Sequence, residues 1–264
     1  GCPQSVEDWV RRESRDERRR GSYRGAVVRE RLSEKARPRL VLAAVSIAIV
    51  AVQLDFFAIN LALPHMARDL AVTVTSLQWV VSGYMLVVGA AMIPAGRLAD
   101  IVGRQRVLLA GIVLFAATGA ACAAASSEAA LIVLRLVQGL GAAMIFPVGI
   151  AIVTNEFPES RRAGAIGLVF GFAALGTAAG PFVGGVLTQQ LSWRWVFLAI
   201  TACALLALPL VAWSVRDTRD ETVPPRLDVT GIATVSLGIA GVTFAFDRGP
   251  TWGWGSASFV AALA

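Results

Sequence analysis

Asp55 is an ionisable residue inside a long apolar segment, where it lies between the polar side chains of Gln53 and Asn60. A charged carboxylate in hydrocarbon costs several kcal/mol, roughly 3 at a helix centre, so we expect Asp55 to face a cavity or a charged partner. A carboxylate placed in this way can bind and release a proton during transport. The alternative is a structural Asp55 that is hydrogen-bonded to a neighbouring helix.

Arg135 is the basic residue that lies deepest in an apolar segment, and Gln138 and Gly139 follow it at three and four residues. In a helix these three residues share one face. A buried guanidinium keeps its proton, so it must be paired or solvated. Arg135 could hold a carboxylate, organise water or bias a proton site through its charge. The alternative is that it only ties two helices together.

Glycine is dense in a third apolar segment, where Gly176, Gly180 and Gly184 recur at steps of four. Such spacing forms a smooth helix face that another helix can approach closely. Packing alone explains this pattern. The adjacent Gly180 and Pro181 also predict a bend, which makes this helix a candidate for a moving element.

A short polar segment, residues 96–106, separates two apolar segments and carries glycine and charge in an ordered spacing. Glycine permits a tight turn, and Asp100 favours a helix N-terminus. Arg104 and Arg106 could contact lipid phosphates or a carboxylate. The arginines alone are typical of any cytoplasmic loop, so the spacing is more informative than the charges.

The other reactive side chains form no catalytic or metal-binding pattern. Cys2, Cys122 and Cys203 have no motif spacing, which predicts neither a disulfide framework nor a metal site. His65, beside Pro64 at the end of an apolar segment, suits a membrane surface better than a proton relay. We find no phosphate-cradling glycine loop after a strand and no nucleophile motif. The sequence therefore disfavours an enzyme, and equally an ATP-driven pump.

The composition indicates which elements position these residues. The chain has 264 residues, of which 56% are hydrophobic and 16% charged, against about 25% charged in typical soluble domains. Its apolar segments are long enough for helices that cross a hydrocarbon core of about 30 Å at roughly 1.5 Å per residue. They are residues 40–63, 77–95, 107–126, 129–153, 164–188, 195–214, 229–246 and a segment that begins near Ser256. We predict an all-α integral membrane protein with a six-helix bundle, a seventh helix and a truncated eighth.

Positive charge predicts the orientation of these helices. Of 24 Lys and Arg residues, 12 lie in the first 39 residues, with 7 acidic residues among them. With a cytoplasmic N-terminus, most other basic residues between the helices also face the cytoplasm, and only Arg68, Arg194 and Arg248 face outside. The tail is then an orientation signal or a lipid contact, and no nucleic-acid partner is expected. We expect interfacial anchors at Trp79, Trp193, Trp195, Trp252 and Trp254 on the outer side and Trp213 on the inner side.

Polar breaks divide the chain into four predicted parts. Residues 1–38 form a charged cytoplasmic tail, and residues 39–214 form the six-helix bundle. A cytoplasmic linker follows at residues 215–228, and residues 229–264 contain the seventh helix and the start of the eighth. The six helices also fit two sets of three, as in nested inverted repeats, although the sequence shows no clear internal symmetry.

Four motifs occur in order along this chain, at residues 54–64, 96–106, 131–143 and 176–185. On these motifs the chain resembles proton-coupled multidrug antiporters of the major facilitator superfamily, in the drug-exporter branch with fourteen helices. The resemblance implies a proton-coupling and transport site at Asp55, Asn60, Arg135 and Gln138. It also implies a gating loop at Gly96, Asp100, Gly103 and Arg104, and an antiporter helix at Gly176, Gly180, Pro181, Gly184 and Gly185.

The resemblance implies export of apolar or cationic drug-like molecules across the plasma membrane in exchange for protons. No cofactor is expected beyond the proton gradient, and the partners are the lipid bilayer, the small-molecule substrate and protons. Phe57 stands where a threonine is common, so a hydroxyl contribution there is not expected. Asp100 and Arg104 should contact a C-terminal half that this chain lacks. The alternatives are another carrier of the superfamily, for a metabolite, sugar or siderophore, and an inactive truncated half-transporter.

Overall fold

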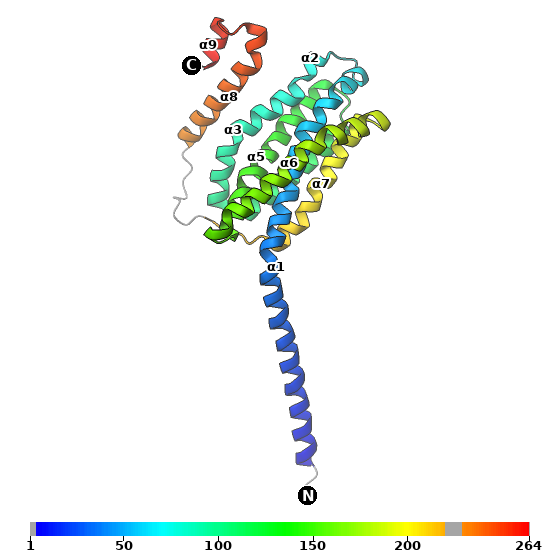
Figure 1. Cartoon of the computed structure of the whole chain (residues 1–264), viewed down its shortest axis with the longest axis vertical. Helices are drawn as coiled ribbons and strands as arrows, with labels where there is room; N and C mark the ends of the chain where they lie inside the picture. The colour runs from blue at the N-terminus through cyan, green and yellow to red at the C-terminus, as the bar shows by residue number, and fades with distance from the viewer. Residues whose placement is uncertain (1–3, 220–228, 264) are drawn as a thin grey trace. The chain divides into compact units, whose positions relative to one another are not determined.

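The computed structural model describes residues 4–219 and 229–263, and every regular element in these ranges is a helix (Figure 1). Pro94, Pro147, Pro181 and Pro209 lie inside helices, which neighbouring helices make tolerable in membrane proteins. The helices are α1 Gln4–Asp69, α2 Val74–Leu77, α3 Trp79–Val102, α4 Arg104–Ala123, α5 Glu128–Glu156, α6 Glu159–Gln190, α7 Trp193–Ser214, α8 Val229–Trp252 and α9 Ala257–Leu263.

The chain divides into two compact units, residues 1–40 and residues 41–264. The first unit is helical from Gln4 onward, as the first part of α1. The second unit contains the rest of α1 and all other helices, and the candidate functional residues lie in it.

Six helical segments of the described chain are long and apolar enough to cross a membrane. They are Ala36–Asp69, Val74–Val102, Arg104–Ala123, Glu128–Glu156, Glu159–Gln190 and Trp193–Ser214. Thr230–Phe246, within α8, is a shorter apolar helix. These helices confirm the prediction of an all-α membrane protein whose first six apolar segments are spans.

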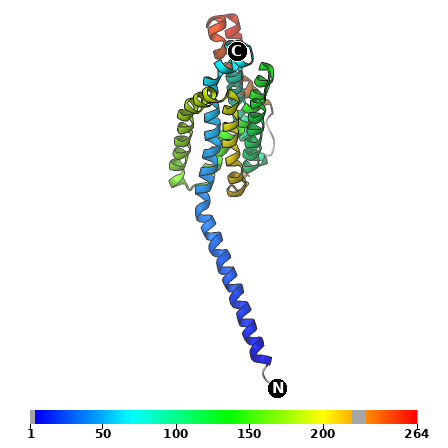
Figure 2. The same ribbon diagram turned by 90° about the vertical axis from the view of Figure 1, so that its right-hand side faces the viewer.

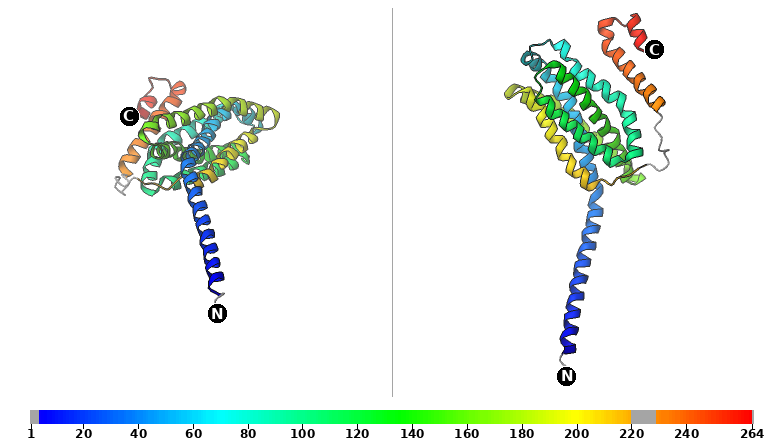
Figure 3. Two further views of the ribbon diagram at one scale, coloured as in Figure 1. Left: turned by 60° about the horizontal axis from the view of Figure 1, so that its bottom comes forward. Right: turned by 180° about the vertical axis from the view of Figure 1, so that it is seen from behind.

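Within the second unit, α5 packs between α3 and α4, and α4 also packs against α7. Helix α6 contacts α7, and Figure 2 shows α6 running beside the later part of α1. Helix α8 packs along α3 and carries α9, as the right-hand view of Figure 3 shows from behind. The helix that bears Arg135 is therefore central in the bundle.

Glycines permit the close approach of α4 and α5. A Cβ atom on Gly141 would lie 2.7 Å from the backbone nitrogen of Phe115, and one on Gly111 would lie 2.8 Å from Cβ of Met144. Small residues at such crossings let two backbones pack directly against each other. This close contact between α4 and α5 fixes the position of α5 and of the polar side chains that α5 carries.

Serine side chains define where α5 and α7 begin. The Ser127 hydroxyl accepts a hydrogen bond from the Ala130 amide at 3.3 Å, and the Ser192 hydroxyl accepts one from the Arg194 amide at 3.3 Å. Such caps satisfy backbone donors that the first turn of a helix leaves unpaired. The start of α7 is therefore fixed beside the end of α6.

Candidate functional site

Asp55 and Arg135 form an ion pair inside the bundle. The NH1 group of Arg135 donates to Oδ2 of Asp55 at 2.6 Å, and both side chains are 0% exposed. The pair joins α1 to α5 across 80 residues of sequence. The two ionisable residues that the sequence places in separate apolar segments are therefore partners of one another.

Residues of α3 and α5 hold the Arg135 guanidinium in place, and Gln138 links it to α4. Its Nε donates to the backbone oxygen of Val80 on α3 at 3.0 Å, and NH1 also donates to Oε1 of Gln138 on α5 at 2.8 Å. Nε2 of Gln138 donates in turn to the backbone oxygen of Phe115 on α4 at 3.4 Å. Arg135 thus keeps hydrogen-bond partners that do not depend on the charge of Asp55.

Aromatic rings cover the guanidinium. The Arg135 guanidinium carbon lies 4.0 Å from the Tyr84 ring centre and 5.9 Å from that of Phe197. Stacking of a cation on an aromatic face is favourable, and more so when both are desolvated. The Tyr84 hydroxyl is also buried. We refer to Asp55, Tyr84, Arg135 and Gln138 as the buried polar cluster.

Part of the hydrogen-bonding capacity of the buried polar cluster is unused. Within the described residues, Oδ1 of Asp55, NH2 of Arg135 and the Tyr84 hydroxyl are buried without a hydrogen-bond partner. Native structures leave few buried polar atoms unsatisfied, and such atoms often mark functional positions. The cluster can therefore accept a further proton or polar group at the carboxylate.

Asn60, the fourth residue of the predicted coupling site, is not part of this cluster. Its side chain is exposed, and its Nδ2 donates to the backbone oxygen of Phe56 in the same helix at 2.7 Å. Nε2 of Gln53 instead donates to Oγ1 of Thr177 at 3.1 Å, which links α1 to α6. Sequence reasoning did not single out this polar contact, because both residues are ordinary in their segments.

The predicted antiporter helix packs its glycine face on α1. A Cβ atom on Gly180 would lie 2.6 Å from Cβ of Phe57, and one on Gly176 would lie 3.1 Å from the Val50 backbone oxygen. Gly184 faces the backbone of Ala58 even more closely. The α1 residues in these contacts lie on the segment that carries Asp55, and α6 is helical without a break through Pro181.

Gly185 lies beside this face, where an added Cβ atom would meet the Leu61 side chain at an ordinary 3.4 Å. Gly96, from the predicted gating loop, lies in α3 with open space around its Cα atom. These two positions therefore tolerate a side chain sterically. In these two motifs, glycine is needed for steric reasons only at Gly103, Gly176, Gly180 and Gly184.

The gating-loop residues form an ion pair of their own at the turn between α3 and α4. The Arg104 side chain donates to Oδ1 of Asp100 from NH2 at 2.7 Å and from Nε at 3.0 Å. Gly103 lies between the helices with φ 128°, a backbone conformation that other residues rarely adopt. Glycine at this position is therefore required by the turn.

This turn is bound to the end of α7. Nε of Arg106 lies 2.9 Å from Oδ2 of Asp217, and the Arg104 amide donates to the backbone oxygen of Thr218 at 3.0 Å. Nε2 of Gln105 donates to the Ala212 backbone oxygen at 3.1 Å. Asp217 lies in the predicted linker, and no motif in the sequence indicates that it is a partner of this loop.

A fourth ion pair among the described residues lies at the other end of the helices. NH1 of Arg194 lies 2.5 Å from Oδ2 of Asp69, which also accepts the indole N–H of Trp193 at 2.9 Å. Trp193 is only 2% exposed, so the prediction that this residue is an anchor in the membrane interface is wrong. By contrast, Trp195 and Trp213 are 51% and 77% exposed.

The described residues contain no group of three or more His, Cys, Asp or Glu side chains that could hold a metal ion. Cys122 and Cys203 have free thiols.

Membrane-length helices that enclose a carboxylate–guanidinium pair are characteristic of membrane carriers, in which intramembrane charges mark transport or proton pathways. The chain belongs to the Major Facilitator Superfamily, whose sequence pattern it matches over residues 45–264. This is a family of multi-pass membrane transporters rather than enzymes, and it confirms the superfamily predicted from the sequence.

Curated relatives include proteins named for drug export. The chain is 34% identical over 221 residues to the tetracenomycin C resistance and export protein of Streptomyces glaucescens, covering 84% of this chain and 41% of the relative. It is 35% identical over 225 residues to the multidrug resistance protein Stp of Mycobacterium tuberculosis, covering 85% and 42%. It is 35% identical over 245 residues to the cephamycin export protein CmcT of Amycolatopsis lactamdurans, covering 92% and 50%.

A solved structure of a peptide transporter, POT, has the same fold, with a TM-score of 0.63 and 19% identity. The match covers 84% of this chain and 48% of that protein. The chain therefore spans half or less of the length of these relatives.

Proposed function

We propose that this chain forms the N-terminal portion of a proton-coupled antiporter that exports apolar or cationic drug-like small molecules. The observation that carries the proposal is the fully buried contact of 2.6 Å between Asp55 and Arg135. The names of the relatives, which include resistance and export proteins, support the substrate class. The proton gradient supplies the energy, and no cofactor takes part.

Protonation of Asp55 is the proposed chemical step. The proton neutralises the carboxylate and weakens its attraction to Arg135, while Arg135 keeps its hydrogen bonds to Val80 and Gln138. These hydrogen bonds offset part, but not all, of the cost of a buried cation whose carboxylate partner has become neutral. A cationic substrate near Asp55 needs the charged carboxylate, so the substrate and the proton cannot bind there at the same time.

The contact between α1 and the glycine face of α6 links protonation of Asp55 to a movement of these helices. Helix α1 carries Asp55 and packs directly on Gly176, Gly180 and Gly184, with a polar contact from Gln53 to Thr177. When the Asp55–Arg135 attraction changes, α1 shifts relative to α5 and carries the α6 contact with it. Closely packed helices pass on small shifts because their interfaces have few stable arrangements.

The complete transport cycle requires a second half. In alternating access, two halves rock around a site near the middle of the membrane. We propose that the loop at Asp100 and Arg104 contacts that second half, and that the N-terminus of the chain faces the cytoplasm of a plasma membrane. The excess of basic residues on one side of the helices supports this orientation.

The proposal is tested with the full-length transporter that contains this chain, reconstituted in vesicles with an imposed pH gradient and ethidium as the transported probe. We expect Asp55→Asn to abolish ethidium movement driven by the gradient. Ethidium exchange without a gradient should persist in that variant, which shows that the protein is folded. Asp69→Asn is the matched control, because its carboxylate belongs to an exposed ion pair. Gradient-driven transport by Asp55→Asn at the wild-type rate would overturn the proposal.

A second measurement separates drug export from the transport of a metabolite or sugar. Addition of ethidium to the detergent-solubilised transporter should release protons, and Asp55→Asn should release none. Proton release by glucose but not by ethidium would assign the protein to a different carrier class.

A further inference from the structure

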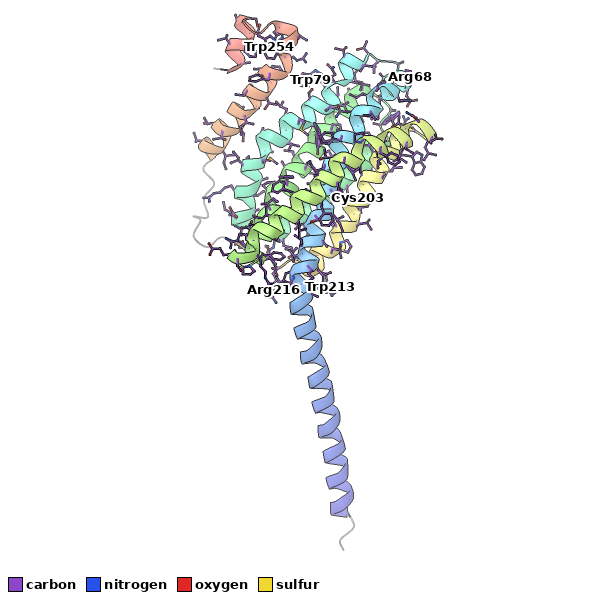
Figure 4. All side chains as sticks on the ribbon, viewed as in Figure 1. Arg68, Trp79, Cys203, Trp213, Arg216 and Trp254 are labelled. Atoms are coloured by element: carbon purple, nitrogen blue, oxygen red, sulfur yellow. The ribbon has the colours of Figure 1, made fainter. Side chains whose placement is uncertain are left out.

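A pocket of about 440 Å³ lies where the end of α1, the last turn of α6 and the start of α7 meet. Figure 4 labels Arg68, one of its lining residues, at this end of the bundle, with Trp213 and Arg216 at the opposite end. The pocket is separate from the buried polar cluster, and the proposed transport step does not use it. Its polar lining comes from His65, Arg68, Asp69, Thr188, Ser192 and Trp193.

The charges at this pocket do not balance. Asp69 is paired with Arg194 at 2.5 Å and also accepts the Trp193 indole N–H, so its negative charge is compensated. Arg68 adds a second positive charge, and in the described chain its hydrogen bond runs from Nε to the backbone oxygen of Pro64. The excess of positive charge favours an anion.

Two buried polar groups at the pocket have no protein partner among the described residues. Thr188 is 6% exposed, and its hydroxyl makes no hydrogen bond. Nδ1 of His65 is buried and likewise without a partner. A buried hydroxyl without a partner loses the hydrogen bonds that water would supply, which is a cost that a ligand can remove.

The N-terminus of α7 contributes a further positive potential. Ser192 and Trp193, its cap and first residue, line the pocket, and the helix is 22 residues long. Helix N-termini carry a partial positive charge and favour anions. The indole N–H of Trp193, the first residue of α7, already donates to a carboxylate oxygen of Asp69.

We propose that this pocket binds a small oxyanion, a carboxylate or phosphate group, through the Arg68 guanidinium and the Thr188 hydroxyl beside the N-terminus of α7. His65 borders the anion as a further polar contact. In the orientation proposed above, the site faces the outer side of the membrane. The anion is either the phosphate of a lipid headgroup or a free anion in solution, since both offer the same chemistry.

The test is isothermal titration calorimetry on the full chain in maltoside micelles, which contain no phosphate. One titration uses inorganic phosphate, and the other uses short-chain phosphatidylglycerol, both at constant ionic strength. We expect saturable binding of at least one probe. Binding of both identifies a general oxyanion site, and binding of phosphatidylglycerol alone identifies a lipid headgroup site.

Three variants assign the binding to this pocket. Arg68→Gln should weaken binding about tenfold, because it removes a charge-assisted contact. Thr188→Val should weaken it about fivefold, the effect of one neutral hydrogen bond. Asp69→Asn should tighten binding, because it removes a negative charge from the pocket lining.

Matched controls come from residues of the same types elsewhere. Arg161→Gln removes an exposed arginine from the first turn of α6, the helix whose last turn carries Thr188. Thr154→Val removes a hydroxyl that is bonded within α5. Both should bind as the wild type does. Wild-type affinity in Arg68→Gln, weaker binding in Asp69→Asn, or no saturable binding of either probe would overturn the proposal.

Discussion

The bundle contains two kinds of carboxylate–arginine pair, one in its interior and others at the ends of its helices. Asp55 and Arg135 are both 0% exposed, whereas the side chains of Arg194 and Asp69 are 37% and 47% exposed. The contact distances are similar, at 2.6 and 2.5 Å. The two pairs therefore differ in environment rather than in geometry.

Environment decides what each pair can do. Exposed pairs are screened by water and typically contribute less than about 1 kcal/mol. A buried pair offsets a large desolvation cost, so the loss of one partner leaves a charge that the interior cannot tolerate. The interior pair is thus suited to respond to a single proton, while pairs at the ends hold helices and turns together.

The largest expected effect is at the interior pair. Asp55→Ala leaves Arg135 buried and unpaired, so we expect a loss of about 3–5 kcal/mol in the free energy of unfolding. Labelling of the buried Cys122 thiol during thermal unfolding in detergent measures this loss. Unfolding at the wild-type temperature would contradict the buried contact.

Removing both charges should sharpen the comparison. The double variant Asp55→Asn with Arg135→Gln eliminates the orphaned charge, so we expect it to recover about 1–3 kcal/mol relative to the additive prediction. A double-mutant cycle of unfolding free energies measures the coupling. Gradient-driven ethidium transport should remain absent, whereas strict additivity would show that the two residues act independently.

The next effect concerns the glycine face that supports α1 beside the interior pair. Gly184→Ala places a methyl group against the Ala58 backbone and should cost about 1–3 kcal/mol, because backbone atoms cannot move aside cheaply. Gly167→Ala is the control on the same helix, with open space around it. It should be neutral or stabilising by up to about 1 kcal/mol. Equal unfolding temperatures for both variants would argue against close α1–α6 packing.

A comparable pair of substitutions tests the turn that carries the Arg106–Asp217 pair. Gly103→Ala should cost about 1–3 kcal/mol, because alanine is strained at φ 128° and its Cβ atom meets the Asp217 side chain. Gly96→Ala, in open space in α3, is the control and should unfold like the wild type. Thermal unfolding of both variants distinguishes a strained turn from a general loss of glycine.

The smallest effect is expected at the Arg106–Asp217 pair, which lies at an end of the helices. The Arg106 side chain is 63% exposed, so Asp217→Asn should cost less than about 1 kcal/mol, and high salt should reduce even that. Unfolding in low and high salt measures both quantities. A loss as large as that of Asp55→Ala would remove the distinction between the two kinds of pair.

Much of the fold follows from the sequence, because a membrane span needs an apolar segment of about 20 residues. Six predicted segments correspond to helices of spanning length, although the helices extend further into the polar connections, as α5 does at Glu156. Apolar runs mark the hydrocarbon core only, whereas a helix continues until a cap or a turn ends it.

The candidate site was predictable in its residue types but not in its contacts. Asp55 and Arg135 stand out as charges in apolar segments, yet their pairing spans 80 residues and depends on how the helices pack. The Val80 backbone oxygen and the Tyr84 ring carry no sequence signal, because any residue has the first and apolar segments often contain the second. Asp217 was missed because a charged residue in a polar connection is ordinary.

The partners of Arg135 have a consequence for biogenesis. An arginine at the centre of an apolar helix makes insertion into the bilayer unfavourable by roughly 3 kcal/mol. Its carboxylate partner lies on α1, and Val80 and Tyr84 lie on α3, all of which precede α5 along the chain. The ribosome therefore delivers the neutralising groups to the membrane before the charge that needs them.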